Sequence, residues 1–89
     1  MLVIEDLEID EHILDKIESK HGVQLSEVEE ICYSEHQARR GSGGVYRLFG
    51  QTEAGRYLLV VVIRRQQNIW KIVTARDMTD SERRLLQDS

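Results

Sequence analysis

Arginine is the residue of this chain whose type and placement best suit the binding of an anion. Nine of the ten basic residues between positions 37 and 89 are arginine, and the planar guanidinium group forms bidentate contacts with phosphates. Arg76 ends the apolar run IWKIVTA, Arg83 follows it, and Arg56 directly precedes the apolar run YLLVVVI. If the two runs pair as a hairpin, Arg56 and Arg76 lie at the same end of it. The sequence therefore predicts a cluster of three cations at one edge of a sheet.

The same arginines also have a structural interpretation. Arg76 and Arg83 can instead pair with Asp77, Glu82 or the acids of the N-terminal half, and so fix the last helix of the chain. The two interpretations stay open at this point, because spacing alone does not show which carboxylates lie within reach.

His21 is the side chain best suited to proton transfer, because histidine titrates near neutral pH. It stands at the expected end of a helix, where the partial negative charge of the helix favours the protonated imidazole. A histidine at such a position also has a purely structural use, which is to satisfy the terminal carbonyl groups of the helix. Catalysis and capping both remain open for His21.

The charge of the chain is divided between its two halves. Residues 1–36 hold eleven acids against Lys16 and Lys20, a balance of −9, and residues 37–89 hold ten bases against five acids, a balance of +5. Together they give the net charge of −4. This asymmetry predicts a basic surface beside an acidic one, and basic surfaces attract phosphates or acidic partners.

The composition argues against several classes of protein. Cys32 is the only cysteine of the 89 residues, which excludes an internal disulfide and a cysteine-based zinc site. The start of the chain, MLVIEDLEID, is acidic where a signal peptide is basic, and the longest apolar run falls far short of the ~20 residues that span a membrane. We therefore expect one cytoplasmic domain over residues 1–89, with no metal, no cofactor and no membrane association.

Two helices are expected near the N-terminus. Apolar residues recur at helical spacing over residues 9–20, and Gly22 is a natural end for this helix because glycine tolerates the left-handed conformation. Ser26 and Glu29 have the spacing of a capping box and predict a second helix close behind. The polar segment SEHQARRGSGG, residues 34–44, is expected to be a flexible loop.

Beyond this loop the pattern changes to that of strands. Three strands are expected, separated by turns at residues 53–55 and 66–68, and they cover residues 45–52, 57–63 and 69–75. Short turns require antiparallel neighbours. Thr79 and Glu82 have capping-box spacing, so a final helix is expected over residues 80–87.

The expected fold class is α+β, with two N-terminal helices, a three-stranded antiparallel sheet and a C-terminal helix. Residues 2–4 are a candidate for a fourth strand at an edge of the sheet. The middle strand, YLLVVVI, is apolar at every position, as in strands that are covered on both faces. Helices are expected on one face, and a second cover, such as a partner chain, on the other.

With this pattern in place, the chain resembles the BrnT-type toxins of bacterial type II toxin–antitoxin pairs, which are compact relatives of the RelE-like ribonucleases. The resemblance is carried by KHGV at 20–23, Glu27, Gly50, GRYLLVV at 55–61 and IVTARDMTDSERR at 72–84. These pieces occur in the family's order and cover most of residues 20–84. The resemblance implies the same helix, sheet and helix arrangement as the patterns above.

The resemblance further implies a metal-independent endoribonuclease that is neutralised by a cognate antitoxin, a BrnA-like protein of the ribbon-helix-helix type. In such an enzyme Arg56, Arg76, Arg83 and His21 are the candidate catalytic residues. Lys20, Arg64 and Tyr57 are candidate RNA-binding residues, because cations hold phosphates and aromatic rings stack on bases. Tyr57 and Trp70 have an alternative place in the core, which is the favoured one for Trp70.

Two other functions are alternatives to ribonuclease activity. A non-catalytic interaction module with the same fold would explain the acidic first helix as a surface for a basic protein. Direct DNA binding by this chain alone is not expected, because the last helix begins with Asp80 and Glu82, which repel phosphates.

Overall fold

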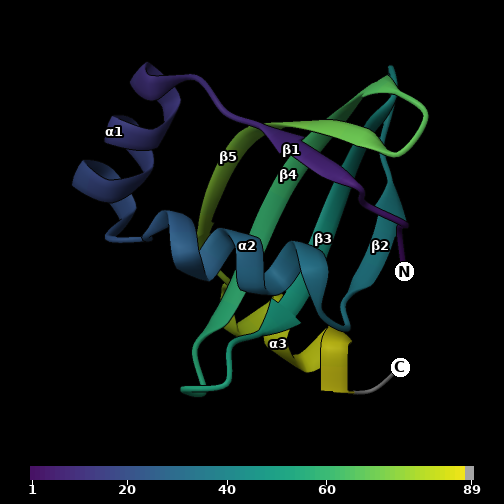
Figure 1. Cartoon of the computed structure of the whole chain (residues 1–89). Coiled ribbons are helices and arrows are strands. Elements are labelled where there is room, and N and C mark those ends of the chain that lie inside the picture. The colour runs from purple at the N-terminus through teal and green to yellow at the C-terminus, as the bar shows by residue number, and fades with distance from the viewer. Residues whose placement is uncertain (88–89) are drawn as a thin grey trace.

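Strands β3 (Val45–Gln51), β4 (Tyr57–Gln66) and β5 (Ile69–Asp77) form the centre of the structure. They pair antiparallel in chain order, as their short connections require. The three predicted strands and the predicted final helix, α3 (Asp80–Gln87), are confirmed. This computed structural model describes residues 1–87 (Figure 1).

The sheet has five strands in the order β1-β5-β4-β3-β2, so the prediction of three or four antiparallel strands was wrong. The first additional strand, β2 (Gln37–Arg40), lies in the segment predicted to be a loop and pairs antiparallel with β3. It has almost no apolar residues to signal a strand, because it forms an edge of the sheet where polar side chains face water.

The second additional strand, β1 (Asp6–Glu8), runs parallel to β5. It lies beyond residues 2–4, which were the candidate for an edge strand. Parallel strands need a long connection, and residues 9–68, about two thirds of the chain, separate β1 from β5. The rule that short turns give antiparallel pairs therefore holds for β3, β4 and β5 but does not apply to β1.

Helices α1 (Glu11–His21) and α2 (Leu25–Tyr33) cover one face of the sheet, with α2 crossing the strands (Figure 1). Gly22 ends α1 in the left-handed conformation, with φ of 61°, as predicted. The capping box of α2 is formed by Gln24 and Glu27. The predicted pair, Ser26 and Glu29, lies inside the helix instead, because α2 begins one residue before Ser26.

The main core lies between these helices and the sheet. Its buried members come from α1, α2, the connection between them and the three central strands, and include Ile17, Val28, Ile31, Leu58 and Trp70. Trp70 is 1% exposed, which confirms its place in the core. A Cβ atom at Gly50 would lie 3.1 Å from Cδ1 of Ile31, so glycine allows α2 to approach β3 closely.

A smaller apolar cluster lies on the opposite face, where α3 packs against the sheet (Figure 1). Its buried members are Phe49, Leu59 and Met78, and Tyr57 and Leu86 pack against them. The second cover that the apolar β4 strand predicted is therefore supplied, over part of this face, by the chain's own last helix.

Candidate active site

A pocket of about 270 Å³ lies between α1 and β5. Three basic side chains of α1 line it, namely Lys16, Lys20 and His21. Lys16 and Lys20 are one helical turn apart and therefore lie on the same side of α1. All three are exposed, so an anion can reach them from solvent. The pocket brings together two predicted site residues, Lys20 and His21, with Lys16, which is not among the predicted site residues.

The opposite wall of the pocket is formed by an irregularity in β5. Ile72 pairs with Val62 and Thr74 pairs with Val61, so Val73 is an extra residue in β5. Such a bulge bends a strand and redirects its side chains, and bulges are frequent beside active sites. Val73 is 43% exposed and lines the pocket with Thr74.

Arg56 holds the end of α1 beside the end of β5. Its Nε and Nη2 donate to the two carboxylate oxygens of Asp77 at 2.8 and 3.1 Å, and its Nη1 donates to Glu27 at 3.0 Å. The remaining N–H groups donate to the main-chain carbonyls of Gly22 at 2.8 Å and His21 at 3.0 Å. A guanidinium group has five N–H donors, and all five are used in these contacts.

These contacts set the electrostatics beside the pocket. Hydrogen bonding to Asp77 is the main cause that raises the pKa of Arg56. In turn, Arg56 lowers the pKa of Asp77, and the nearby His21 lowers it further. The terminal carbonyls of α1 are therefore capped by Arg56 rather than by the His21 side chain, which leaves the imidazole at the pocket.

Arg76 lies at the same end of the β4–β5 hairpin as Arg56 but points to the other face of the sheet. It pairs with Leu59 of the α3-side cluster, whereas Asp77 pairs with Leu58 of the main core, because neighbouring residues of a strand face opposite sides. Arg76 donates to both oxygens of Glu82, at 2.8 and 3.0 Å.

The remaining candidates are distributed over two further places. Arg83 lies near Arg76 on α3, with its guanidinium carbon 4.4 Å from the centre of the Tyr57 ring. Arg64 lies at the opposite end of the hairpin, stacked on Trp70 at 5.0 Å. The seven predicted site residues thus do not form one cluster. Lys20 and His21 share the pocket, with Arg56 behind them, while Arg76, Arg83 and Tyr57 lie beside α3.

The other two histidines do not line the pocket. His12 is exposed in the first turn of α1. His36 is 6% exposed, and its Nε2 accepts the main-chain N–H of Leu2 at 3.1 Å. The sequence signal that distinguished His21 from the other two histidines was therefore its position in the last turn of a helix. For Lys16, the signal was its spacing of four residues from Lys20.

Within residues 1–87, no group of three or more histidine, cysteine, aspartate or glutamate side chains is placed to hold a metal ion. None of the helices in this part of the chain is both long and apolar enough to cross a membrane.

Comparison with known proteins gives a structural similarity without a sequence match. No family model matches the chain, and no curated protein matches it in sequence. Among solved structures, the Brucella abortus ribonuclease toxin BrnT superimposes with a TM-score of 0.71, covering 84% of this chain and 97% of BrnT at 12% identity. The chain has the BrnT fold. The resemblance inferred from KHGV, GRYLLVV and the closing IVTARDMTDSERR is confirmed at the level of the fold.

Proposed function

We propose that this chain is a metal-independent endoribonuclease and the toxin of a bacterial toxin–antitoxin pair, acting on RNA in the cytoplasm. The proposal is carried by one observation, which is that a basic pocket containing His21 lies on the fold of a ribonuclease toxin. Its proposed partner is a cognate antitoxin of the BrnA-like, ribbon-helix-helix type. We expect no DNA binding by this chain alone.

RNA cleavage without a metal requires two proton transfers and a stabilised transition state. The ribose 2′-oxygen loses its proton and forms a bond to the adjacent phosphorus, and the bond from phosphorus to the 5′-oxygen breaks as that oxygen gains a proton. We assign the proton transfers to His21, because imidazole both accepts and donates protons near neutral pH. Lys16 and Lys20 would stabilise the negative charge on the phosphorane.

Arg56 acts on this site by positioning it. All five of its donors are engaged, so a direct contact with phosphate would require an existing hydrogen bond to break. Arg76 is in a similar state, because Glu82 occupies both of its Nη groups. Because Arg76 lies on the other face of the sheet from the His21 pocket, it can contact only a different phosphate of the bound RNA, and that phosphate would have to replace Glu82. Arg83, Tyr57 and Arg64 would bind more distant parts of the RNA.

The experiment compares two histidines of the same helix. Purified wild-type protein, His21→Gln and His12→Gln are incubated with a long single-stranded RNA in excess EDTA, and the cleavage rate is measured across pH. We expect His21→Gln to lower the rate by about 10²–10⁴-fold and His12→Gln to leave it unchanged. DNA of the same sequence should stay intact, because it lacks the 2′-hydroxyl.

Each outcome has a distinct meaning. Equal rates for all three proteins would remove His21 from the mechanism. Cleavage that EDTA abolishes would contradict metal independence. The same cleavage assay is run on Arg76→Gln and on the exposed control Arg84→Gln. If a phosphate of the RNA replaces Glu82 on Arg76, Arg76→Gln should lower the cleavage rate and Arg84→Gln should not.

A second candidate function is a non-catalytic interaction module with the same fold. The observation that favours it is the engagement of Arg56 and Arg76 by carboxylates of the chain itself. A folded wild-type protein that leaves RNA intact at every pH, with or without added divalent cations, would decide for this second function.

A further inference from the structure

Two arginines face each other across strands β2 and β3. Arg39 and Arg47 are directly opposite in the register, and both are exposed. Like charges at directly opposed positions destabilise a pair of strands. Within residues 1–87, neither arginine has a carboxylate partner at ion-pair distance; Arg47 contacts only the ring of Phe49, at 6.0 Å. The arrangement therefore has a cost in the free chain that a bound anionic group would remove.

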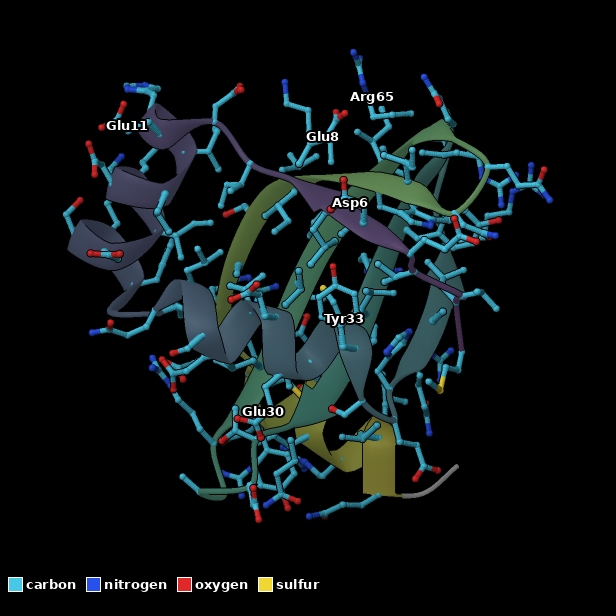
Figure 2. All side chains as sticks on the ribbon, in the orientation of Figure 1. Asp6, Glu8, Glu11, Glu30, Tyr33 and Arg65 are labelled. Carbon is cyan, nitrogen blue, oxygen red and sulfur yellow. The ribbon has the colours of Figure 1, made fainter. Side chains whose placement is uncertain are left out.

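The chain's own acidic side chains lie largely on the other side of the molecule. Figure 2 labels Asp6, Glu8, Glu11 and Glu30, which belong to β1, α1 and α2. The basic residue that Glu8 does reach is Arg65, at 3.4 Å. Arg39 and Arg47 instead share a cross-strand row with Val61, which packs in the α3-side cluster. Since no carboxylate of residues 1–87 lies at ion-pair distance from either arginine, carboxylates of another molecule can pair with them.

A groove of about 120 Å³ lies between these arginines and α3. Its other walls are formed by Gln37, Phe49, Leu85 and Leu86, together with Glu82, whose carboxylate is already paired with Arg76. Leu85 is 59% exposed. Sites for small molecules usually have volumes of about 300–1,000 Å³, so this groove has room for a single side chain. An apolar floor with two cations at its rim is complementary to an apolar side chain that has carboxylates beside it.

We propose that this groove, lined by Arg39, Arg47 and Leu85, docks an acidic amphipathic segment of a partner protein. An apolar side chain of the partner packs against the exposed Leu85, and carboxylates of the same partner segment pair with the two arginines. RNA is a poorer occupant, because the one aromatic ring in the groove, Phe49, is only 7% exposed and is already covered by Arg47. Base stacking, on which single-stranded RNA binding depends, has no ring available here.

The docking site is separate from the pocket between α1 and β5. β2 lies three strand spacings from β5 in the sheet, which is roughly 14 Å. Docking in the groove does not depend on RNA cleavage. His21 does not line the groove, and Arg39 and Arg47 do not line the pocket, so a result that refutes one proposal leaves the other untouched.

The test titrates peptides into isotope-labelled protein and follows the main-chain NMR signals. The probe is a synthetic peptide in which leucines at helical spacing alternate with glutamates, and the matched peptides carry lysine for glutamate or serine for leucine. We expect the leucine–glutamate peptide alone to shift the signals of β2, β3 and α3 and of no other element. We expect added salt to reduce these shifts. The absence of shifts at millimolar peptide, or shifts centred elsewhere, would overturn the proposal.

Two variants of β2 and β3 sharpen the test. Arg47→Glu should weaken binding of the acidic peptide by roughly tenfold or more, because opposed like charges are costly in an interface. Arg40→Glu is the matched control, since Arg40 is the exposed neighbour of Arg39 on the same strand and pairs with Tyr46, which packs against the main core on the other face. Equal weakening by both variants would indicate a general charge effect and contradict a defined groove.

A stability measurement separates docking from a structural role. Arg39→Thr removes the like-charge pair, so it should raise the Tm of the free protein by a few degrees while weakening peptide binding. A lower Tm would show that Arg39 supports the fold and would refute the reasoning. If an RNA oligonucleotide shifts the same signals at lower concentration than the peptide does, the occupant of the groove is RNA and not an acidic partner protein. If sedimentation shows a dimer that Arg47→Glu dissociates, the occupant is a second copy of this chain.

Discussion

Glu82 carries two structural tasks that a single substitution can separate. Its Oε1 accepts the Thr79 N–H at 2.9 Å, and the Thr79 hydroxyl accepts the Glu82 N–H at 3.2 Å, which together form the predicted capping box of α3. The same carboxylate binds Arg76 in a bidentate pair. Glutamine also serves in a capping box, so Glu82→Gln removes the charge and keeps the cap, whereas Glu82→Ala removes both.

The magnitude follows from the pKa of Glu82. Hydrogen bonding to Arg76 is the largest cause that lowers this pKa from 4.5 to about 2. At about 1.4 kcal/mol per pH unit, the difference of about 2.5 units corresponds to about 3.4 kcal/mol for a shielded pair. Because the Arg76 side chain is 36% exposed, solvent screening reduces this, and we expect Glu82→Gln to lower the free energy of unfolding by about 1–2 kcal/mol.

The pH dependence has a definite sign. A carboxylate whose pKa is lower in the folded state stabilises the protein above its unfolded pKa, which is 4.5 here, and loses this contribution as the pH falls toward the folded value of about 2. The difference in stability between wild type and Glu82→Gln should therefore be constant above pH 5. It should shrink between pH 4.5 and pH 2.

Urea unfolding followed by circular dichroism, repeated at several pH values, measures this difference. Glu82→Ala should cost about 0.5–1.5 kcal/mol more than Glu82→Gln at every pH, since it also loses the capping hydrogen bond. The matched control is Glu18→Gln, on the exposed part of α1, which has no ion pair within residues 1–87. A difference for Glu82→Gln that does not change with pH would show that the Arg76 pair is not its cause.

Two further predictions concern Arg56 and Cys32. Arg56→Lys keeps the charge but loses the planar guanidinium group that joins Asp77, Glu27 and the end of α1. The Tm of this variant should therefore be several degrees lower than that of the wild type. An unchanged Tm in a heating scan would contradict this. Burial, with a smaller effect from Glu29, raises the pKa of the Cys32 thiol to about 12, so the native protein should not react with iodoacetamide at pH 8 while the urea-unfolded chain does. Rapid labelling of the native protein would refute the assigned burial.

The elements whose signals are local were predictable from the sequence. Helix α3 begins with the Thr79 and Glu82 capping box, and α1 ends at Gly22, because both signals involve residues within one or two turns. The central hairpins followed from apolar runs separated by short turns, which also placed Arg56 and Arg76 at one end and Arg64 at the other. His21 was found by its position in the last turn of α1, and Lys20 by its charge beside it.

Other features depend on contacts between segments that are distant in sequence. The pairing of β1 with β5 leaves no local pattern, and β2 is polar because an edge strand buries little. The bulge at Val73 arises from the register of β5 against β4, which IWKIVTA does not reveal. The sequence predicted that Arg56 and Arg76 share one end of a hairpin, but alternation along β5 sends Arg76 to Glu82 on one face and Asp77 to Arg56 on the other.

The sequence by itself thus determined which residues carry charge and proton-transfer chemistry, and roughly where along the chain they stand. Only the tertiary structure decided which of them are already neutralised by a partner. All five donors of Arg56 are used by groups from α1, α2 and β5, while Arg39 and Arg47 face each other without a carboxylate from residues 1–87. The physical reason is that an ion pair depends on distances of a few ångströms, and for residues far apart in the chain only the packing of the fold sets those distances.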